Sequence, residues 1–327
     1  MTFTPTSPLA VEADGLVKVF GKQRAVDGVS LAVPRGAVYG VLGPNGAGKT
    51  TTIKMLATLL RPDSGSARIF GRDVVAEPNA VRSLIGVTGQ YASVDEELSA
   101  TENLLIFGRL LGLSRADARR RATELLDEFD LAEAAAKPLK NFSGGMRRRL
   151  DLAASLIATP PLLFLDEPTT GLDPRTRAQM WDTIRRLVRE GATVVLTTQY
   201  LDEADQLADR IAVIDHGRVI ADGTADELKS SIGGSSVHLT IDPAQLEEAR
   251  RIVGDFLGVS TQVSPEAGRL TAALPDPNLT ADLLIRLRDW EIGVEEITVS
   301  KPTLDEVFLT ITGHPADESD DTERSAA

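Results

Sequence analysis

Short apolar runs alternate with longer helical patterns along the chain, from about residue 10 to residue 228. The runs that predict strands are 37–43, 85–89, 161–166, 192–199 and 211–215. Most of them are followed by apolar residues at the spacing of a helix. Alternating strands and helices build a largely parallel sheet that helices cover. We therefore expect an α/β domain over residues 10–228, with a hairpin at the sheet's edge after the turn Asp215–Arg218.

The stretch from residue 99 to residue 140 has helical spacing throughout, with many leucines and alanines and no strand pattern. Ser99 and Glu102 form a capping-box pair that marks a helix start. This pattern predicts a helical subdomain, spanning about residues 91–150, inserted into the α/β domain.

A second domain is predicted beyond a glycine- and serine-rich linker at 229–236. From 237 to 313 the patterns follow the order β-α-β-β-α-β, which is typical of a small ferredoxin-like α+β domain. Its last helix opens with a capping box at Thr303 and Glu306. The acidic stretch 314–327 predicts a disordered tail.

Composition narrows the classes of function. A net charge of −13 over 327 residues opposes general nucleic-acid binding, which needs a basic face. The absence of cysteine excludes a disulfide framework, a thiolate zinc site and a thiol nucleophile. The start of the chain lacks the pattern of a signal peptide, and no apolar run approaches the roughly 18 residues that span a bilayer. We expect a cytoplasmic chain, and a partner would have to supply any membrane spans.

The segment "GPNGAGKT" follows a predicted strand and opens a helix, which is the context of a phosphate-binding P-loop. Its glycines let backbone N–H groups turn inward as an anion nest, and the helix dipole adds positive potential. Lys49 would reach the β- and γ-phosphates, and the Thr50 hydroxyl would ligate Mg²⁺. The predicted nucleotide contacts of this loop are Gly43, Pro44, Asn45, Gly46, Ala47, Gly48, Lys49, Thr50 and Thr51.

Two carboxylates, Asp166 and Glu167, stand at the end of the apolar run "PLLFLD". An acid at that strand end can hold Mg²⁺ opposite the P-loop, and its neighbour can orient or deprotonate a water that attacks the γ-phosphate. The three histidines lie in the hairpin turn, the second domain and the tail. None of the histidines is placed to act as the catalytic base, so a carboxylate is the best remaining candidate. We expect Asp166 to bind the metal and Glu167 to act as the base.

The segment "NFSGGMRRRLDLA" lies between these two motifs, and Ser143 in it is a natural N-cap. Gly144 and Gly145 expose backbone donors at the start of a helix. With this third motif in place, residues 10–228 resemble an ATP-binding-cassette (ABC) ATPase, although Phe142 and Met146 depart from the family's usual Leu-Ser-Gly-Gly-Gln signature. The resemblance implies a homodimer that holds two ATP molecules, each between one chain's P-loop and the other chain's Ser143–Gly145.

The resemblance assigns roles to four further residues. Phe20 matches the aromatic residue that stacks on adenine, and Val26 lies where an apolar residue packs on the nucleotide. Gln90 matches the glutamine that touches Mg²⁺ and senses the transport domain. Asp173, at the end of "TTGLD", matches the loop that crosses the dimer interface.

Gln199 helps to identify which group of ABC ATPases the chain resembles. It ends a predicted strand at the position where the family usually has a histidine that contacts the γ-phosphate. Glutamine can donate an amide N–H to phosphate, but it cannot become cationic. Together with the linker and the extra domain that ends in "PTLDEVFLTITG", this residue makes the chain similar to daunorubicin-resistance-type ATPases. Those are peripheral subunits on the cytoplasmic face of the membrane, in drug or lipid exporters with a separate integral membrane permease.

Other readings stay open at this point. A soluble ABC ATPase of translation or DNA maintenance usually has two cassettes or a coiled-coil insertion, and an idle nucleotide sensor would not need Lys49, Asp166 and Glu167. An importer subunit fits less well with Gln199 and the extra domain. The arginines 147–149 indicate a solvated helix face rather than a membrane contact. The last helix either closes the core of the small domain or helps to hold the dimer or the partner.

Overall fold

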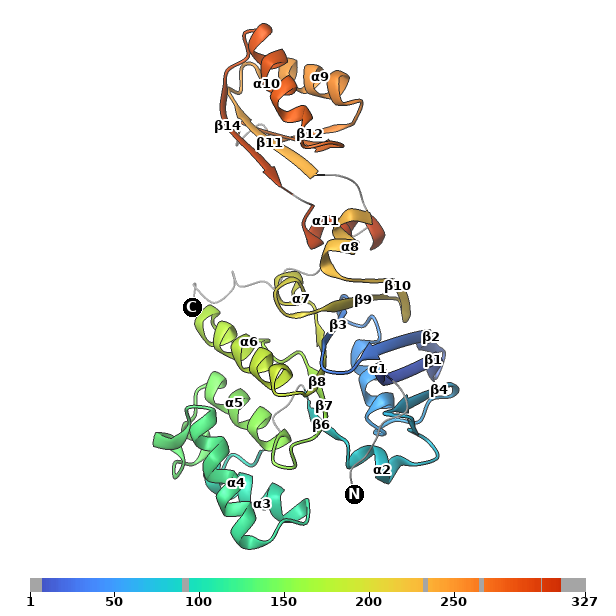
Figure 1. Ribbon diagram of the computed structural model, residues 1–327, viewed down its shortest axis with the longest axis vertical. Helices are drawn as coiled ribbons and strands as arrows, with labels where there is room; N and C mark the ends of the chain where they lie inside the picture. The colour runs from blue at the N-terminus through green and yellow to red at the C-terminus, as the bar shows by residue number, and fades with distance from the viewer. Residues whose placement is uncertain (1–7, 90–93, 232–234, 265–267, 301, 313–327) are drawn as a thin grey trace. The chain divides into compact units, whose positions relative to one another are not determined.

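The computed structural model describes residues 8–89, 94–231, 235–264, 268–300 and 302–312 (Figure 1). The chain forms two compact units, which divide between Thr224 and Ala225. The first part of the expected linker is helical, because residues 229–231 complete helix α8 (Ala225–Ser231) and Leu228 is buried. Strand β11 already starts at Ser235, so it includes the end of the expected linker. The predicted acidic tail, 314–327, lies outside the described residues.

A six-stranded sheet in the order β10-β9-β3-β8-β7-β6 lies at the centre of the first unit. Its strands are β3 (Val38–Leu42), β6 (Ile85–Thr88), β7 (Leu162–Asp166), β8 (Thr193–Thr198), β9 (Arg210–Asp215) and β10 (Arg218–Gly223). All neighbours from β9 to β6 pair in parallel, and β9 and β10 form an antiparallel hairpin. The predicted strands, the parallel sheet and the edge hairpin are confirmed.

The central strands separate two apolar cores. Alternate residues of a strand point to opposite faces, so Leu163 and Leu165 of β7 enter one core while Leu162 and Phe164 enter the other. The first core contains residues of the helices α3, α4, α5 and α6, and the second contains residues of α1. The helices of the first unit are α1 (Lys49–Leu56), α2 (Pro78–Arg82), α3 (Ala100–Leu110), α4 (Arg115–Glu128), α5 (Gly144–Ser155), α6 (Pro174–Arg189) and α7 (Leu201–Leu207).

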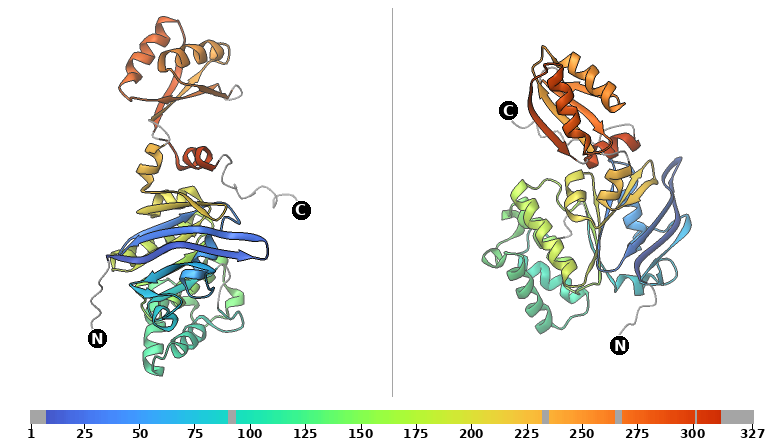
Figure 2. Two further views of the ribbon diagram at one scale, coloured as in Figure 1. Left: turned by 90° about the vertical axis from the view of Figure 1, so that its right-hand side faces the viewer. Right: turned by 45° about the horizontal axis from the view of Figure 1, so that its top comes forward.

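An antiparallel sheet completes the second of these cores, and the sequence patterns did not predict it. It has the order β2-β1-β4-β5, and Figure 2 shows β1 and β2 as a long blue hairpin. Its strands are β1 (Leu9–Phe20), β2 (Gln23–Pro34), β4 (Ser64–Ile69) and β5 (Arg72–Asp73). Val29, Leu31 and Val33 alternate with exposed residues along β2 and pack into the core.

The stretch with helical spacing contains α3 and α4, as predicted. Ser99 caps α3 with a complete capping box, because its hydroxyl accepts from the Glu102 amide while the Glu102 side chain accepts from the Ser99 amide. Ser114 caps α4 by accepting from the backbone of Asp117. Alanines and leucines of both helices pack with α5 in the core that contains α6.

The second unit contains a ferredoxin-like β-α-β-β-α-β fold, as predicted. Its elements are β11 (Ser235–Ile241), α9 (Leu246–Leu257), β12 (Thr261–Ser264), β13 (Arg269–Leu274), α10 (Leu279–Asp289) and β14 (Val294–Ser300). The sheet is antiparallel in the order β12-β13-β11-β14, and α9 and α10 cover one of its faces (Figure 1). The last helix, α11 (Leu304–Thr312), contacts α8 and starts with the expected capping box at Thr303. Within the described ranges, every helix is too short or too polar to span a bilayer.

The buried ring of Phe164 provides a test of this core. Phe164 is fully buried, so Phe164→Ala should lower the free energy of unfolding by about 3–5 kcal/mol through lost burial and a cavity. Phe20→Ala removes the same atoms from a ring that is 50% exposed, and its effect should stay below about 1 kcal/mol. Urea denaturation followed by circular dichroism measures both, and equal shifts would contradict the assignment of Phe164 to the core.

Candidate active site

The P-loop joins β3 to α1, and its glycines are required by close backbone contacts. A Cβ on Gly43 would lie 2.2 Å from the carbonyl oxygen of Ile214, and one on Gly48 would lie 2.4 Å from that of Ala25. Gly48 also has a φ of +105°, which side chains rarely adopt. The loop therefore keeps a bare backbone at the start of α1, where N–H groups can face an anion, although the amides of Gly43 and Ala47 already donate to the carbonyls of Thr198 and Pro44.

Lys49 is folded over this loop. Its Nζ donates to the carbonyl oxygens of Gly43 at 2.6 Å and Pro44 at 3.0 Å, and it lies 3.9 Å from Oε1 of Glu167. The ammonium group is thus buried between the loop and the end of β7. A phosphate held by the loop would meet this cation, as the P-loop motif predicts.

Asp166 and Thr50 converge from two neighbouring motifs. Oδ1 of Asp166 accepts hydrogen bonds from the hydroxyls of Thr50 at 3.0 Å and Thr197 at 2.5 Å. A hydroxyl and a carboxylate are the hard oxygen donors that Mg²⁺ prefers, and that ion usually keeps waters and phosphates as its other ligands. Among the described residues, no cluster of three or more histidines and acids could hold a metal by itself. The donor set therefore fits a magnesium ion that is shared with a nucleotide.

Glu167 occupies a strained turn that aims its carboxylate at the P-loop lysine. Its φ is 50°, in the left-handed region, and its amide donates to the backbone oxygen of Thr197 at 3.1 Å and to its hydroxyl at 3.0 Å. Oε2 accepts a long hydrogen bond from Thr170 at 3.4 Å. The side chain is buried next to Lys49, where the predicted base would meet a water beside the γ-phosphate.

Gln199 follows β8, the strand between β3 and β7. It is 9% exposed, and its buried Oε1 has no hydrogen-bond partner among the described residues. Buried polar atoms are rarely left unpaired. Since turning the amide over exchanges its oxygen and nitrogen, this position can offer either an acceptor or an N–H donor to a bound group.

The other expected nucleotide contacts differ in their surroundings. Phe20 ends β1 with a half-exposed ring, so its face is available for stacking. Val26 is fully buried in the apolar core, and its packing on the nucleotide stays a prediction. It supports the wall behind the loop, where the carbonyl of Ala25 approaches Gly48. Thr51 is half-buried in the first turn of α1, and Gln90 lies outside the described residues.

Ser143, Gly144 and Gly145 lie apart from the chain's own P-loop. Ser143 caps α5 by accepting from the Met146 amide at 3.2 Å. Helix α5 packs in one core and α1 in the other, and the two helices lie on opposite sides of the central strands (Figures 1 and 2). A Cβ on Gly144 would meet nothing within 4 Å, so the first turn of α5 offers an open surface.

Asp173 caps α6 next to this surface. Its carboxylate accepts from the Thr176 amide at 3.0 Å and from the Thr176 hydroxyl at 2.6 Å, and that hydroxyl hydrogen bond is the main cause of a lowered pKa for Asp173. A Cβ on Gly145 would come within 2.6 Å of the Thr176 side chain. The structure therefore brings the signature glycines and the start of α6 together, as two segments that are predicted to meet a second chain.

Sequence reasoning missed two buried charged residues near the catalytic turn. Arg148 was expected on a solvated helix face, but its side chain is 13% exposed and burial lowers its pKa. Three consecutive arginines on a helix of 3.6 residues per turn cannot all face the same side, and this signal could have revealed the exception.

Glu203 in α7 is the second missed residue, and it is fully buried. It accepts from the Thr169 hydroxyl at 2.8 Å and from the Trp181 indole at 3.2 Å. Burial raises the pKa of its carboxyl group, against the smaller lowering effect of the neighbouring hydroxyls and indole. Its acidic neighbours in the sequence gave no sign that it would be buried.

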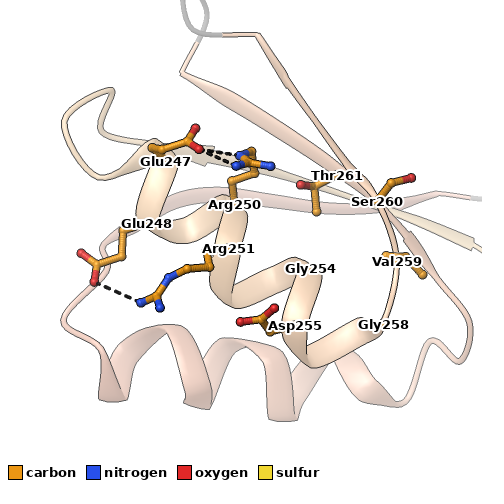
Figure 3. Close-up of a pocket in the computed structure, with 10 residues that line it drawn as sticks. All are labelled: Glu247, Glu248, Arg250, Arg251, Gly254, Asp255, Gly258, Val259, Ser260 and Thr261. Atoms are coloured by element: carbon orange, nitrogen blue, oxygen red, sulfur yellow. Dashed lines mark hydrogen bonds and ion pairs between the residues drawn. The ribbon is translucent and has the colours of Figure 1, made fainter.

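A wide groove of about 710 Å³ lies along α9 in the second unit (Figure 3). Four of its charged side chains form two pairs, with Glu247 at 2.5 Å from Arg250 and Glu248 at 4.0 Å from Arg251. No predicted site residue lines it. The candidate chemistry is therefore at the carboxyl end of the central sheet in the first unit.

Comparison with known proteins agrees with this geometry. Residues 26–170 match the ABC transporter family, and residues 223–312 match the C-terminal domain of DrrA1-3-like ATP-binding proteins. The daunorubicin/doxorubicin resistance ATP-binding protein DrrA of Streptomyces peucetius is 59% identical, over 94% of both chains. The Nod factor export ATP-binding protein I of Ralstonia nicotianae is 39% identical, over 93% of this chain and 94% of that one.

Solved structures show the same cassette. One described as the ATP binding subunit of an ABC transporter has a TM-score of 0.62 and 30% identity, over 68% of this chain and 93% of that one. The family models and the curated relatives together cover both the P-loop domain and the small C-terminal domain. The chain belongs to the ATP-binding-cassette family, as an ATP-binding protein with a DrrA-type C-terminal domain.

Proposed function

We propose that this chain is the ATP-hydrolysing subunit of an exporter that moves a drug or a lipid-like molecule through a separate integral membrane permease. The observation that carries the proposal is the convergence of Lys49, Asp166 and Glu167 at one end of the sheet. Similarity to a daunorubicin/doxorubicin resistance protein supports a drug as the exported molecule. The chain would act as a peripheral protein on the cytoplasmic face of the membrane, held there by the permease.

The residues of the site have separate roles in ATP hydrolysis. Thr50 and Asp166 would hold Mg²⁺, which neutralises phosphate charge when bound. Lys49 stabilises the negative charge on the β- and γ-phosphates. The carboxylate of Glu167 accepts a proton from the water whose oxygen attacks the γ-phosphorus, while the bond between that phosphorus and the bridging oxygen of ADP breaks. The products are ADP and inorganic phosphate.

Two chains would complete two sites. The first turn of α5, with Ser143, Gly144 and Gly145, has open space at Gly144, and α5 lies on the opposite side of the central strands from α1, the helix that follows the chain's own P-loop. We propose that it contacts ATP bound to the P-loop of a second copy, with Asp173 at the same interface. Closing and reopening of this homodimer would drive the permease.

Replacing the proposed base gives the first test. Glu167→Gln should keep ATP affinity and slow hydrolysis by roughly 10²–10⁴, because the amide cannot accept the proton. Phosphate release after mixing with ATP measures the rate, and a fluorescent ATP analogue measures binding. Glu190→Gln, an exposed position beyond α6, is the matched control. Hydrolysis at the control's rate in Glu167→Gln would show that another group is the base.

A charge at the signature turn tests the dimer. Gly144→Asp should leave ATP affinity of the monomer unchanged, since a Cβ at Gly144 has open space, but its carboxylate would repel the partner's ATP. ATP-dependent dimerisation, measured by light scattering in a Glu167→Gln background, should be lost. Lys49→Ala should instead weaken nucleotide binding in the monomer. The sandwich is refuted if Gly144→Asp weakens monomer binding as much as Lys49→Ala does.

Gln199 allows a test of pH dependence. Gln199→Ala should slow hydrolysis about ten- to a hundredfold if its amide contributes the 1.5–3 kcal/mol typical of a hydrogen bond to a charged group. Gln199→His should keep substantial activity, since imidazole can donate from the same position. Its rate should change between about pH 5 and 8, where imidazole titrates, and the rate of the natural protein should lack this component. Equal turnover in Gln199→Ala and the natural protein would mean that Gln199 only ends a strand.

A further inference from the structure

Arg148 of α5 places its guanidinium group against the backbone of the catalytic turn. Nη2 donates to the carbonyl oxygens of Asp166 and Glu167, both at 2.7 Å, and Nε donates to that of Pro168 at 2.9 Å. Nη1 donates to the carbonyl of Gly89 at 2.7 Å. One side chain thus binds three successive carbonyls, starting at the last residue of β7, and the segment that follows β6.

This contact is unlike that of a surface arginine. Burial lowers the pKa of Arg148, although the charges of Asp151, Asp166, Glu203 and Glu167 act in the opposite direction. Removing a guanidinium group from water has a high desolvation cost, which must be offset by hydrogen bonds from its N–H groups. The rigid planar fork of arginine satisfies several acceptors at once, and here it does so on the turn that carries the proposed base.

The same residue is part of the helix that begins at the signature. Arg148 lies five residues after the N-cap Ser143, a distance of about 7.5 Å along a helix. A shift of the first turn of α5, when it meets ATP on a second chain, would therefore move the guanidinium. Its hydrogen bonds would carry that shift to the backbone of Glu167, whose φ of 50° leaves it few other conformations.

We propose that Arg148 is a positioning residue that couples contact of the Ser143–Gly145 turn with the partner's ATP to the placement of the Glu167 carboxylate in its own site. The inference rests on the proposed function, because it needs Glu167 as the base and the turn as a contact across the dimer. Each ATP site would then sense the occupancy of the other.

A charge-conserving substitution tests this coupling. Arg148→Lys keeps a cation but loses the planar fork, so it cannot hold all four carbonyls. We expect kcat to fall ten- to a hundredfold, with unchanged ATP affinity of the monomer. The Hill coefficient of hydrolysis against ATP concentration should fall towards one, because the two sites lose their connection.

The neighbouring arginines provide matched controls on the same helix. Arg147 bonds to Glu96 at 2.6 Å, and Arg149 donates to the carbonyl of Phe129 at 3.0 Å. Neither contacts the catalytic turn in a hydrogen bond of the described structure. Arg147→Lys and Arg149→Lys should therefore keep kcat and the Hill coefficient close to those of the natural protein. Equal behaviour of all three variants would overturn the proposal.

A double-mutant cycle separates positioning from general damage to the fold. If Arg148 acts through Glu167, Arg148→Lys should add little slowing to Glu167→Gln, where the base is already lost. A helix that is merely disrupted would slow both backgrounds by the same factor, and this result would refute the role of Arg148. Absence of hydrolysis in the natural full-length chain, with its permease present, would instead refute the proposed function itself.

Discussion

The parallel pairing of β3, β8 and β7 is the constraint on which the candidate site depends. Parallel strands end at the same edge of a sheet, and groups that follow them meet there. The register of the strands brings their last residues side by side, because Leu42 pairs with Thr198 and Asp166 pairs with Thr197. A slip of one residue would turn Asp166 to the other face of the sheet and away from Thr50. Strand register thus places Asp166, and the P-loop and the turn at Glu167 then bring Thr50 and the base to the same edge of the sheet.

The sequence predicts those parts of the fold whose pattern is local and uninterrupted. Strands β3, β7 and β8 are buried along their whole length, so their apolar runs stand out. The β-α-β-β-α-β order of the second unit is equally plain. Strand β1 escaped prediction because its pairing register with β2 shifts at several points, including Ala13 to Leu16, whereas the alternation of Val29, Leu31 and Val33 in β2 is regular and could have predicted that strand. Each bulge breaks the period of two that marks a strand.

The candidate site also contains some residues that the sequence predicts and others that it does not. Lys49, Asp166 and Glu167 could be predicted because each belongs to a short motif whose chemistry and flanking strand are local. Arg148 and Glu203 could not, since their burial depends on segments that are distant in the sequence.

The buried side chains of Arg148 and Glu203 explain how the turn after β7 holds Glu167 in place, although its backbone belongs to no helix or strand. Arg148 binds its carbonyls, while Glu203 accepts from Thr169 in the same turn and from Trp181 on α6. The charge of Glu203 is one of those that raise the pKa of Arg148 against the effect of burial, so removal of Glu203 would leave the guanidinium less compensated. Asp173, the residue expected at the dimer interface, is the N-cap of helix α6. The turn that carries the base is therefore bound by the signature helix through Arg148 and leads on to the loop before α6, and the proposed coupling would pass a movement at the interface to Glu167 along this route.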